Sequence, residues 1–163
     1  MNPADLSPEA RARLAYAAAA REVSDYARGL VGTIGDAIPG TQRIRDAREL
    51  LVAAHTVKDL ATLVAALDSN LDAEGTWDAI AHALGLPEHE ARRRYEPVIE
   101  RWEQQLPAGE LDATIFGDWT TGLRHDPDPI GTAEAVDEWY RRHREPYDPE
   151  AASPVVEALS RLA

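Results

Sequence analysis

Carboxylates, a histidine and three consecutive arginines lie within seven residues of this chain. The segment from 88 to 94 reads Glu88-His89-Glu90-Ala91-Arg92-Arg93-Arg94. A guanidinium group presents a planar fork of donors that matches phosphate oxygens and guanine edges. A glutamate accepts a hydrogen bond from cytosine N4, and a histidine attracts an anion only when it is protonated. These residue types therefore offer the chemistry of nucleic-acid contact.

The same segment also has a purely structural interpretation. Residues four apart lie on one face of a helix, so Glu88 would pair with Arg92 and Glu90 with Arg94. Such pairs would reduce the availability of the guanidinium groups to phosphate. From 76 to 106 the sequence holds four arginines against six carboxylates, a net charge of −2, whereas nucleic-acid-binding domains are usually basic. Both interpretations stay open at this point.

The sequence around this segment predicts two helices joined by a tight turn. Ile80 and Leu84 recur at helical spacing and would face a core. Gly85 suits a left-handed helix end, because it has no Cβ to clash there. Pro87 is tolerated in the first turn of a second helix, where its missing N–H is not needed. The residues expected to be buried together are Ile80, Leu84, Leu86 and Ala91.

This stretch resembles the DNA-binding helix-turn-helix of sigma factor region 4 and related regulators. The matching positions are Trp77, Ile80, Ala81, Leu84, Gly85 and Leu86. The flanking segments 137–143 and 154–159 are similar to a group of uncharacterised actinobacterial helix-turn-helix proteins. The resemblance implies a second helix in the major groove of double-stranded DNA, with Glu88 and His89 at base-reading positions. Arg92 and Arg93 would contact phosphates or guanine edges. Pro87 departs from the motif, which usually has serine or threonine as the N-cap.

Composition and charge limit the class of protein. A chain of 163 residues fits one domain, or one domain with appendages. The absence of cysteine excludes disulfides and cysteine–zinc sites. A net charge of −12 disfavours non-specific attraction to nucleic acid or anionic membranes, so any DNA contact must come from a local basic patch. The apolar runs are shorter than a membrane span and no secretory signal is visible, so we expect a cytoplasmic protein.

Helical periodicity extends over most of the chain and predicts an all-α fold. We expect a helix-turn-helix core with long N-terminal helices and a loop-plus-helix C-terminal tail. The predicted units are 1–40, an N-terminal helix for bracing or dimerisation; 41–106, the helix-turn-helix domain; and 107–163, a wrapping loop and C-terminal helices. The N-terminal helix carries an apolar face that would pack on the motif or on a second copy. That face comprises Val23, Ala27, Leu30 and Ile34.

Short sequence signals predict where these helices begin and end. Ser7 would cap the first helix and the Pro39-Gly40 pair would break the N-terminal helical region. Thr41 and Thr132 would cap later helices, Ser153-Pro154 would open the last one, and Pro97 would cause a kink or a restart. A further apolar stripe comprises Ile44, Ala47, Leu51 and Ala54.

No residue pattern points to catalysis, to a metal or to a cofactor. His82 and His89 are seven residues apart, but Gly85 and Pro87 argue against one helix spanning both. Arg48 and His55 are interpreted as a surface arginine and a half-buried histidine. Trp77 is expected to anchor the core. The other tryptophans would pin the second motif helix, the loop and the C-terminal helix, through Trp102, Trp119 and Trp139.

The sequence therefore predicts a helix-turn-helix DNA-binding protein, a transcriptional regulator that acts by binding and is not an enzyme. A homodimer is expected, because helix-turn-helix proteins commonly present two recognition helices to successive turns of the major groove. The alternative is a protein-interaction module on the same scaffold that has lost DNA binding. The net charge of −12 and the acidic start of the second motif helix suit such a protein partner.

Overall fold

The computed structural model describes residues 6–68, 73–105, 128–148 and 153–162, and these are all-helical with no strand among them. The helices are α1 (Pro8–Gly32), α2 (Gly40–Leu67), α3 (Ala73–Leu84), α4 (Glu88–Gln105), α6 (Pro129–His143) and α7 (Pro154–Leu162). The predicted all-α class is confirmed for this part of the chain. Trp119 and most of the predicted wrapping loop lie outside the described residues.

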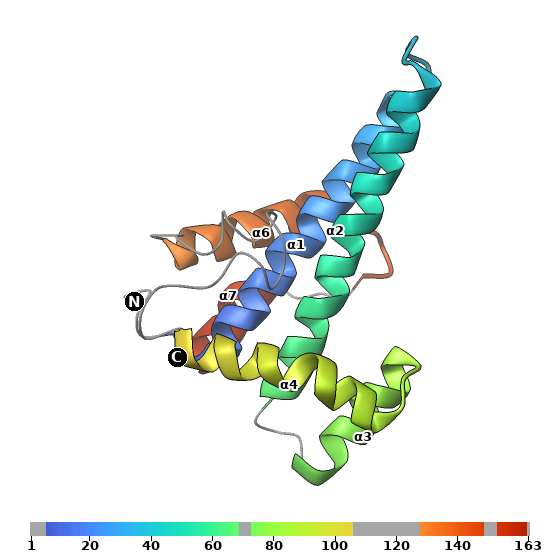
Figure 1. Ribbon diagram of the computed structural model, residues 1–163. Coiled ribbons are helices and arrows are strands. Elements are labelled where there is room, and N and C mark those ends of the chain that lie inside the picture. Colours follow the sequence, from blue (N-terminus) through green and yellow to red (C-terminus); the bar gives the residue numbers. More distant parts are fainter. Residues whose placement is uncertain (1–5, 69–72, 106–127, 149–152, 163) are drawn as a thin grey trace.

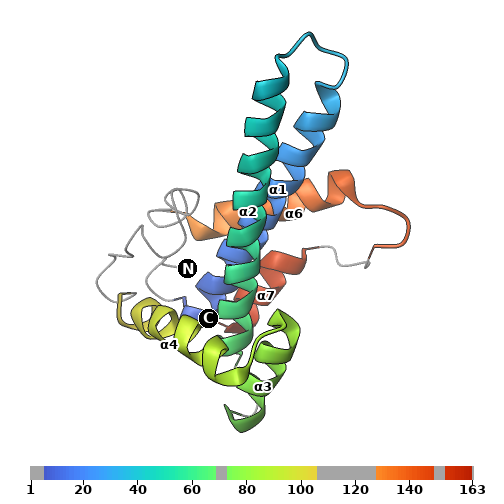
Figure 2. The ribbon, with the colours of Figure 1, turned by 45° about the vertical axis from the view of Figure 1, so that its right-hand side comes forward.

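A long hairpin formed by α1 and α2 organises the molecule (Figure 1). Near its base, α6 and α7 pack against α1, while α3 and α4 contact the C-terminal part of α2. The far half of the hairpin projects from this body, as the turned view in Figure 2 also shows. The candidate site on α3 and α4 therefore lies at the end of the molecule opposite the hairpin tip.

Two apolar clusters lie against different faces of α1. The first comprises Ala12, Ala15, Ala19, Leu60, Leu63 and Trp102, and joins α1 to α2 and α4. The second comprises Leu6, Ala10, Leu14, Ala133 and Leu159, and joins the same helix to α6 and α7. Alanine at most of the α1 positions allows neighbouring helices to approach closely. The alanine-rich first helix is thus the central element of the core.

The predicted helix starts have mixed outcomes. The Ser7 hydroxyl accepts a hydrogen bond from the Ala10 amide at 3.1 Å, so the first cap is confirmed. The prediction for Thr41 was wrong, because α2 begins at Gly40 with Pro39 as N-cap and without a side-chain cap. The prediction for Thr132 was also wrong, because the Asp128 carboxylate caps α6 by accepting from the Gly131 amide at 2.9 Å. Aspartate followed by proline at the first helical position sets an earlier start.

A buried aspartate from another helix supports the start of α7. The helix begins at Pro154, as the Ser153-Pro154 signal predicts. The Asp137 side chain on α6 accepts hydrogen bonds from the Val155 amide at 2.9 Å and from the Val156 amide at 3.0 Å. Asp137 is only 1% exposed. This carboxylate therefore satisfies two amides that the start of a helix leaves without intrahelical partners.

The apolar face predicted on α1 differs from the expectation. Val23, Ala27 and Leu30 are half-buried on a helix that packs mainly along α2. Ile34 lies beyond the end of α1 and is 74% exposed. The other three positions lie in the half of α1 that leads to the hairpin tip, where the described helices cover the face only in part.

One helix among the described residues, α2, is long and apolar enough to cross a membrane by length and composition. The core helix of a protein without a membrane segment can meet the same criterion, and α2 contributes the buried Leu60 and Leu63 to the first apolar cluster. An ion pair between Lys58 and Asp59, at 3.2 Å, also lies within this helix. Of the apolar window in α2, 28% is buried within the protein, and the criterion by itself does not identify a membrane span.

Candidate nucleic-acid interface

The turn between α3 and α4 has the geometry expected of Gly85. Its φ angle is +65°, in the left-handed region. The Gly85 amide donates to the His82 carbonyl at 3.1 Å, and the Leu86 amide donates to the Ala81 carbonyl at 3.0 Å. This pair of hydrogen bonds is the Schellman arrangement, which closes a helix on a glycine. The predicted left-handed end of the first motif helix is therefore confirmed.

Pro87 immediately precedes the second helix of the pair, α4. Its carbonyl accepts hydrogen bonds from the Glu90 amide at 3.0 Å and from the Ala91 amide at 3.1 Å. Only Gly85, Leu86 and Pro87 separate the two helices. A connection this short fixes the direction of α4 relative to α3.

The apolar contacts beneath the turn agree in part with the expectation. Ile80 and Ala91 are buried, at 6% and 0% exposure, and Ala81 is buried with them. Leu84 and Leu86 are only half-buried, so the prediction that all four residues are buried was wrong for these two. They flank the turn, where solvent reaches the outer end of the helix pair. Small residues, rather than the leucines, occupy the most enclosed positions.

Two aromatic side chains anchor α4 to the body. The Tyr95 hydroxyl donates to the Asp59 carboxylate on α2 at 2.7 Å, and burial together with this hydrogen bond raises the pKa of Tyr95. The Trp102 indole N–H donates to the Pro8 carbonyl at the start of α1, at 3.1 Å. α4 continues through Pro97 without the predicted restart. One face of α4 is therefore fixed on the hairpin, and the opposite face remains outside.

The outer face of α4 carries the four predicted site residues. Glu88 and His89 are exposed in its first turn, and the Arg93 side chain is 79% exposed. Arg92 is half-buried and lies between two carboxylates. Its guanidinium is 2.7 Å from Glu88 and 3.0 Å from Glu96. These four residues belong to one continuous helix and share its N-terminal half.

The local ion pairs confirm one predicted pair and correct the other. Glu88 and Arg92 pair as expected, and the hydrogen bonds to Glu88 and to Glu96 raise the pKa of Arg92. Glu90 pairs with Arg93 at 3.6 Å, so the predicted pair with Arg94 was wrong. The Arg94 guanidinium lies over the Tyr95 ring, 5.4 Å from its centroid. For Arg94, stacking on the neighbouring Tyr95 ring thus replaces the expected ion pair with Glu90, four residues earlier.

The prediction that Trp77 anchors the core was wrong, because this residue is not among the buried core residues and lies beside the candidate interface instead. Trp77 is half-buried on α3, and the Arg92 guanidinium lies 5.4 Å from the centroid of its ring. The indole therefore supports the same arginine that the two carboxylates hold. Nothing in the residue spacing predicted this contact, because it crosses the turn between two helices.

The arginines near the start of α2 do not extend this face. Arg43 lies at the hairpin tip, where its guanidinium donates to the carbonyls of Ile34 and Asp36. Arg45 donates to Gln42 on the same part of α2. This part of α2 is at the far end of the hairpin from α4 (Figure 1). Arg43 and Arg45 near the start of α2 and the arginines of α4 thus belong to separate surfaces, whereas Lys58, which pairs with Asp59, lies beside α4.

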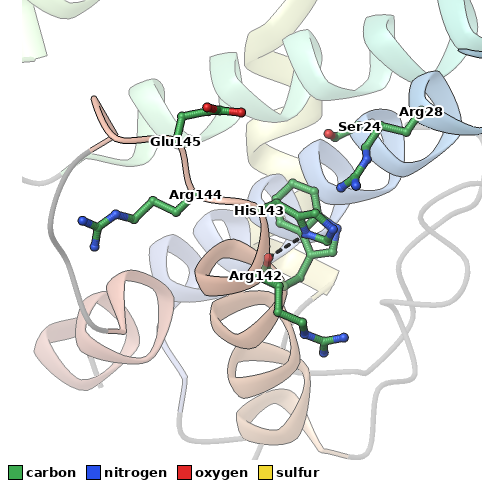
Figure 3. Close-up of a pocket in the computed structure, with 7 residues that line it drawn as sticks. Ser24, Arg28, Arg142, His143, Arg144 and Glu145 are labelled. Atoms are coloured by element: carbon green, nitrogen blue, oxygen red, sulfur yellow. Dashed lines mark hydrogen bonds between the residues drawn. The ribbon is translucent and has the colours of Figure 1, made fainter.

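A pocket of about 500 Å³ lies elsewhere, between α1 and the C-terminal end of α6 (Figure 3). Trp139 lines it and is fixed by an indole N–H that donates to Asp25 at 2.7 Å. The His143 ring nitrogen Nδ1 lies 2.8 Å from the Trp139 carbonyl. The side chains of Arg142 and Arg144 point away from each other. Basic residues at a helix C-terminus are stabilising there, so this cluster has a structural explanation.

The described residues hold no group of three side chains suited to a metal ion. His82 and His89 are both exposed and lie on different helices. His55 is exposed rather than half-buried as expected, since that side of α2 has no covering element among the described helices. Among the described residues, the outer face of α4 is therefore the best candidate for a functional site.

Comparison with protein-family models, with curated proteins and with solved structures gives no match to this chain. The functional argument consequently depends on the turn, on the charges of α4 and on the packing that positions them.

Proposed function

We propose that this protein is a helix-turn-helix DNA-binding protein, a transcriptional regulator that acts in the cytoplasm by binding and without catalysis. The observation that carries the proposal is the glycine-closed turn at Gly85, which leads into a helix whose first turn is exposed. In a helix-turn-helix, that first turn enters the major groove and presents side chains to base edges. α3 holds α4 from one side, and the hairpin holds it from the other.

The residues proposed to contact DNA have different roles. Glu88 and His89 occupy the first turn of α4, where their side chains would face base edges. The exposed Arg93 would contact a phosphate, since it makes only a loose ion pair with Glu90 at 3.6 Å. Arg92 is held by Glu88 and Glu96, so it would reach a phosphate only by exchanging a carboxylate for it.

Because Glu88 competes with phosphate for Arg92, it would affect both the affinity and the sequence preference of the proposed interface. The Glu88 carboxylate lies where the negative potential of DNA is strong, which lowers affinity for every sequence. When it faces a cytosine, it accepts from N4 and recovers part of that loss. Glu88 would thereby favour sequences with a cytosine at the contacted position. Affinity that falls for most sequences and persists for a few is the basis of specificity.

The test is fluorescence anisotropy with labelled genomic DNA fragments at low and moderate salt. The variant Arg92→Ala/Arg93→Ala should weaken binding to all fragments and flatten the salt dependence, by about 0.9 in the log–log slope for each phosphate that the protein no longer neutralises. Arg101→Ala is the matched control, because Arg101 is exposed on α4 but lies beyond Pro97. Glu88→Gln should raise general affinity and reduce the differences among fragments. The proposal fails if no fragment binds at low salt and the double variant equals the wild type.

A protein-interaction module is the second candidate, and the ion pairs of Arg92 favour it. Two carboxylates within 3.0 Å occupy this guanidinium, and the whole chain carries a net charge of −12. On this view the outer face of α4 binds a protein partner. A pull-down from native lysate with wild type and Arg93→Glu then tests it. The interaction-module proposal is supported if the wild type captures a partner that Arg93→Glu does not capture. The same protein samples must also show no DNA binding.

A further inference from the structure

α2 carries a row of apolar side chains that the protein leaves open to solvent. Its members are Ile44, Ala47, Leu51 and Ala54, which we call the α2 stripe. All four residues are exposed, Ile44 at 73% and Leu51 at 57%. A contiguous apolar row on a surface is uncommon unless a partner covers it. The α2 stripe therefore calls for an explanation that the packing of the described residues does not supply.

The α2 stripe does not belong to the hairpin interface. Ala53 and Leu60 mark the buried side of α2, at 2% and 0% exposure. At 3.6 residues per turn, the mean direction of the α2 stripe is about 150° away from that side. Figures 1 and 2 show α1 alone running beside this part of α2. The described helices leave the α2 stripe on an open side of the projecting hairpin.

The spacing of the α2 stripe indicates a helical partner. Its residues are separated by intervals of three, four and three, which is the seam pattern of packed helices. The order of large and small side chains along the α2 stripe then indicates which helix would pack against it. Reversing the α2 stripe about residue 49 exchanges Ile44 with Ala54 and Ala47 with Leu51. In an antiparallel pair of α2 helices, every layer would set a large side chain against a small one.

We propose that the α2 stripe is a self-association surface, on which a second copy of this chain packs its α2 antiparallel about a two-fold axis at residue 49. Each stripe is complementary to itself, as a two-fold interface requires. The two hairpins would together form a layer of four helices, with the two α2 helices in the middle and an α1 helix on each outer side. The seam from Ile44 to Ala54 is only about 15 Å long, so the interface is small and a micromolar dimer is expected. This proposal does not depend on DNA binding.

Charges beside the axis give the dimer a distinctive salt response. Arg48 precedes residue 49 and is exposed, and it makes no ion pair with the described residues. In the antiparallel pair the two Arg48 side chains would lie on the same side of the seam and repel each other. Salt screens such repulsion between exposed charges. Association should therefore strengthen with salt, in contrast to DNA binding, which salt weakens.

The experiment is sedimentation of the full chain over a wide concentration range. Leu51→Glu should raise the dimer dissociation constant about 30-fold or more, because it places a charge in the centre of the seam. Val52→Glu is the matched control, since Val52 is 43% exposed but points to another side of the same helix. It should change the constant by no more than about twofold. A wild type that stays monomeric at about 500 μM, far above the expected micromolar dissociation constant, overturns the proposal.

A size exchange tests the antiparallel register. Ala47→Leu sets leucine against leucine, and Leu51→Ala leaves alanine against alanine, so each should weaken the dimer about tenfold or more. The double variant Ala47→Leu/Leu51→Ala restores one large and one small residue in each layer and should recover most of the affinity. A parallel pair would instead be tightened by Ala47→Leu, which contradicts the proposal. Circular dichroism verifies that each variant keeps its helices.

Discussion

Two glycines of this chain should respond to the same substitution with opposite signs. Gly85 has a φ angle of +65° in the turn between α3 and α4, whereas Gly29 lies inside the last part of α1. A Cβ added at either position would meet no other atom within 4 Å. Packing therefore contributes little, and the backbone conformation alone decides the effect on the free energy of unfolding.

The expected magnitudes follow from that conformation. An alanine in the left-handed region costs about 1–2 kcal/mol, while replacing glycine stiffens the unfolded chain and returns about 0.4–1 kcal/mol. Gly85→Ala should therefore destabilise the protein by about 1 kcal/mol in total. Gly29→Ala should stabilise it by about 0.5–1 kcal/mol, because alanine is the better helix former. Gly85→Asn should cost less than alanine, since asparagine tolerates the left-handed region.

Urea unfolding followed by circular dichroism measures these differences. Each kcal/mol should also shift the melting temperature by about 2–4 °C for a chain of this size. If Gly85→Ala equals or exceeds the wild type in stability while Gly29→Ala behaves as expected, the turn does not hold the left-handed conformation. The positioning of α4 by the Schellman turn would then be wrong.

Three further substitutions probe the contacts that hold the helices. Asp137→Ala should lower the free energy of unfolding by about 2–4 kcal/mol, since it leaves two partly buried amides of α7 unpaired; a loss below about 0.5 kcal/mol would contradict the cap. Ser7→Ala should cost about 0.5–2 kcal/mol in the same urea assay. Tyr95→Phe should cost about 1.5–3 kcal/mol at about pH 8, because it removes the hydrogen bond to Asp59. The folded-state pKa of Tyr95 is raised, so this contribution is complete below about pH 10 and is lost as the pH rises through that raised pKa. The difference between wild type and Tyr95→Phe should accordingly narrow at alkaline pH, and a constant difference would exclude the linkage.

Signals within a few residues predicted the local structure well. Ser7 ahead of a proline and an alanine run indicates a helix start, and Gly85 after Leu84 indicates a helix end. Both depend on contacts no more than five residues away in the chain. Thr132 was a wrong choice for the same kind of reason, because Asp128 four residues earlier offers a stronger cap.

Contacts between distant residues were not predictable from the pattern. Asp137 caps a helix that begins 17 residues later, and Tyr95 donates to Asp59 across 36 positions. The burial of a residue also depends on elements far away. The α2 stripe has the periodicity of a core face, yet no element among the described residues buries it.

In the candidate site, some contacts were predictable from local spacing and others depend on distant residues. A periodic pattern placed Glu88, His89, Arg92 and Arg93 on one helix, and the pairing of Glu88 with Arg92 followed from their spacing. Glu96 is also four residues from Arg92, so the same spacing was sufficient to predict this second ion pair. The contact between Arg92 and Trp77 needs the angle between α3 and α4, which the sequence does not specify.

Contact between DNA and the first turns of α4 is tested most directly by amide chemical shifts in a titration of the isotope-labelled protein with a DNA duplex at low salt. The largest perturbations should fall between 85 and 94, around Glu88, His89, Arg92 and Arg93, and should disappear in the Arg92→Ala/Arg93→Ala variant. Perturbations centred on Arg28 and Arg142 beside the α6 pocket, or none at saturating duplex, would contradict the proposed interface.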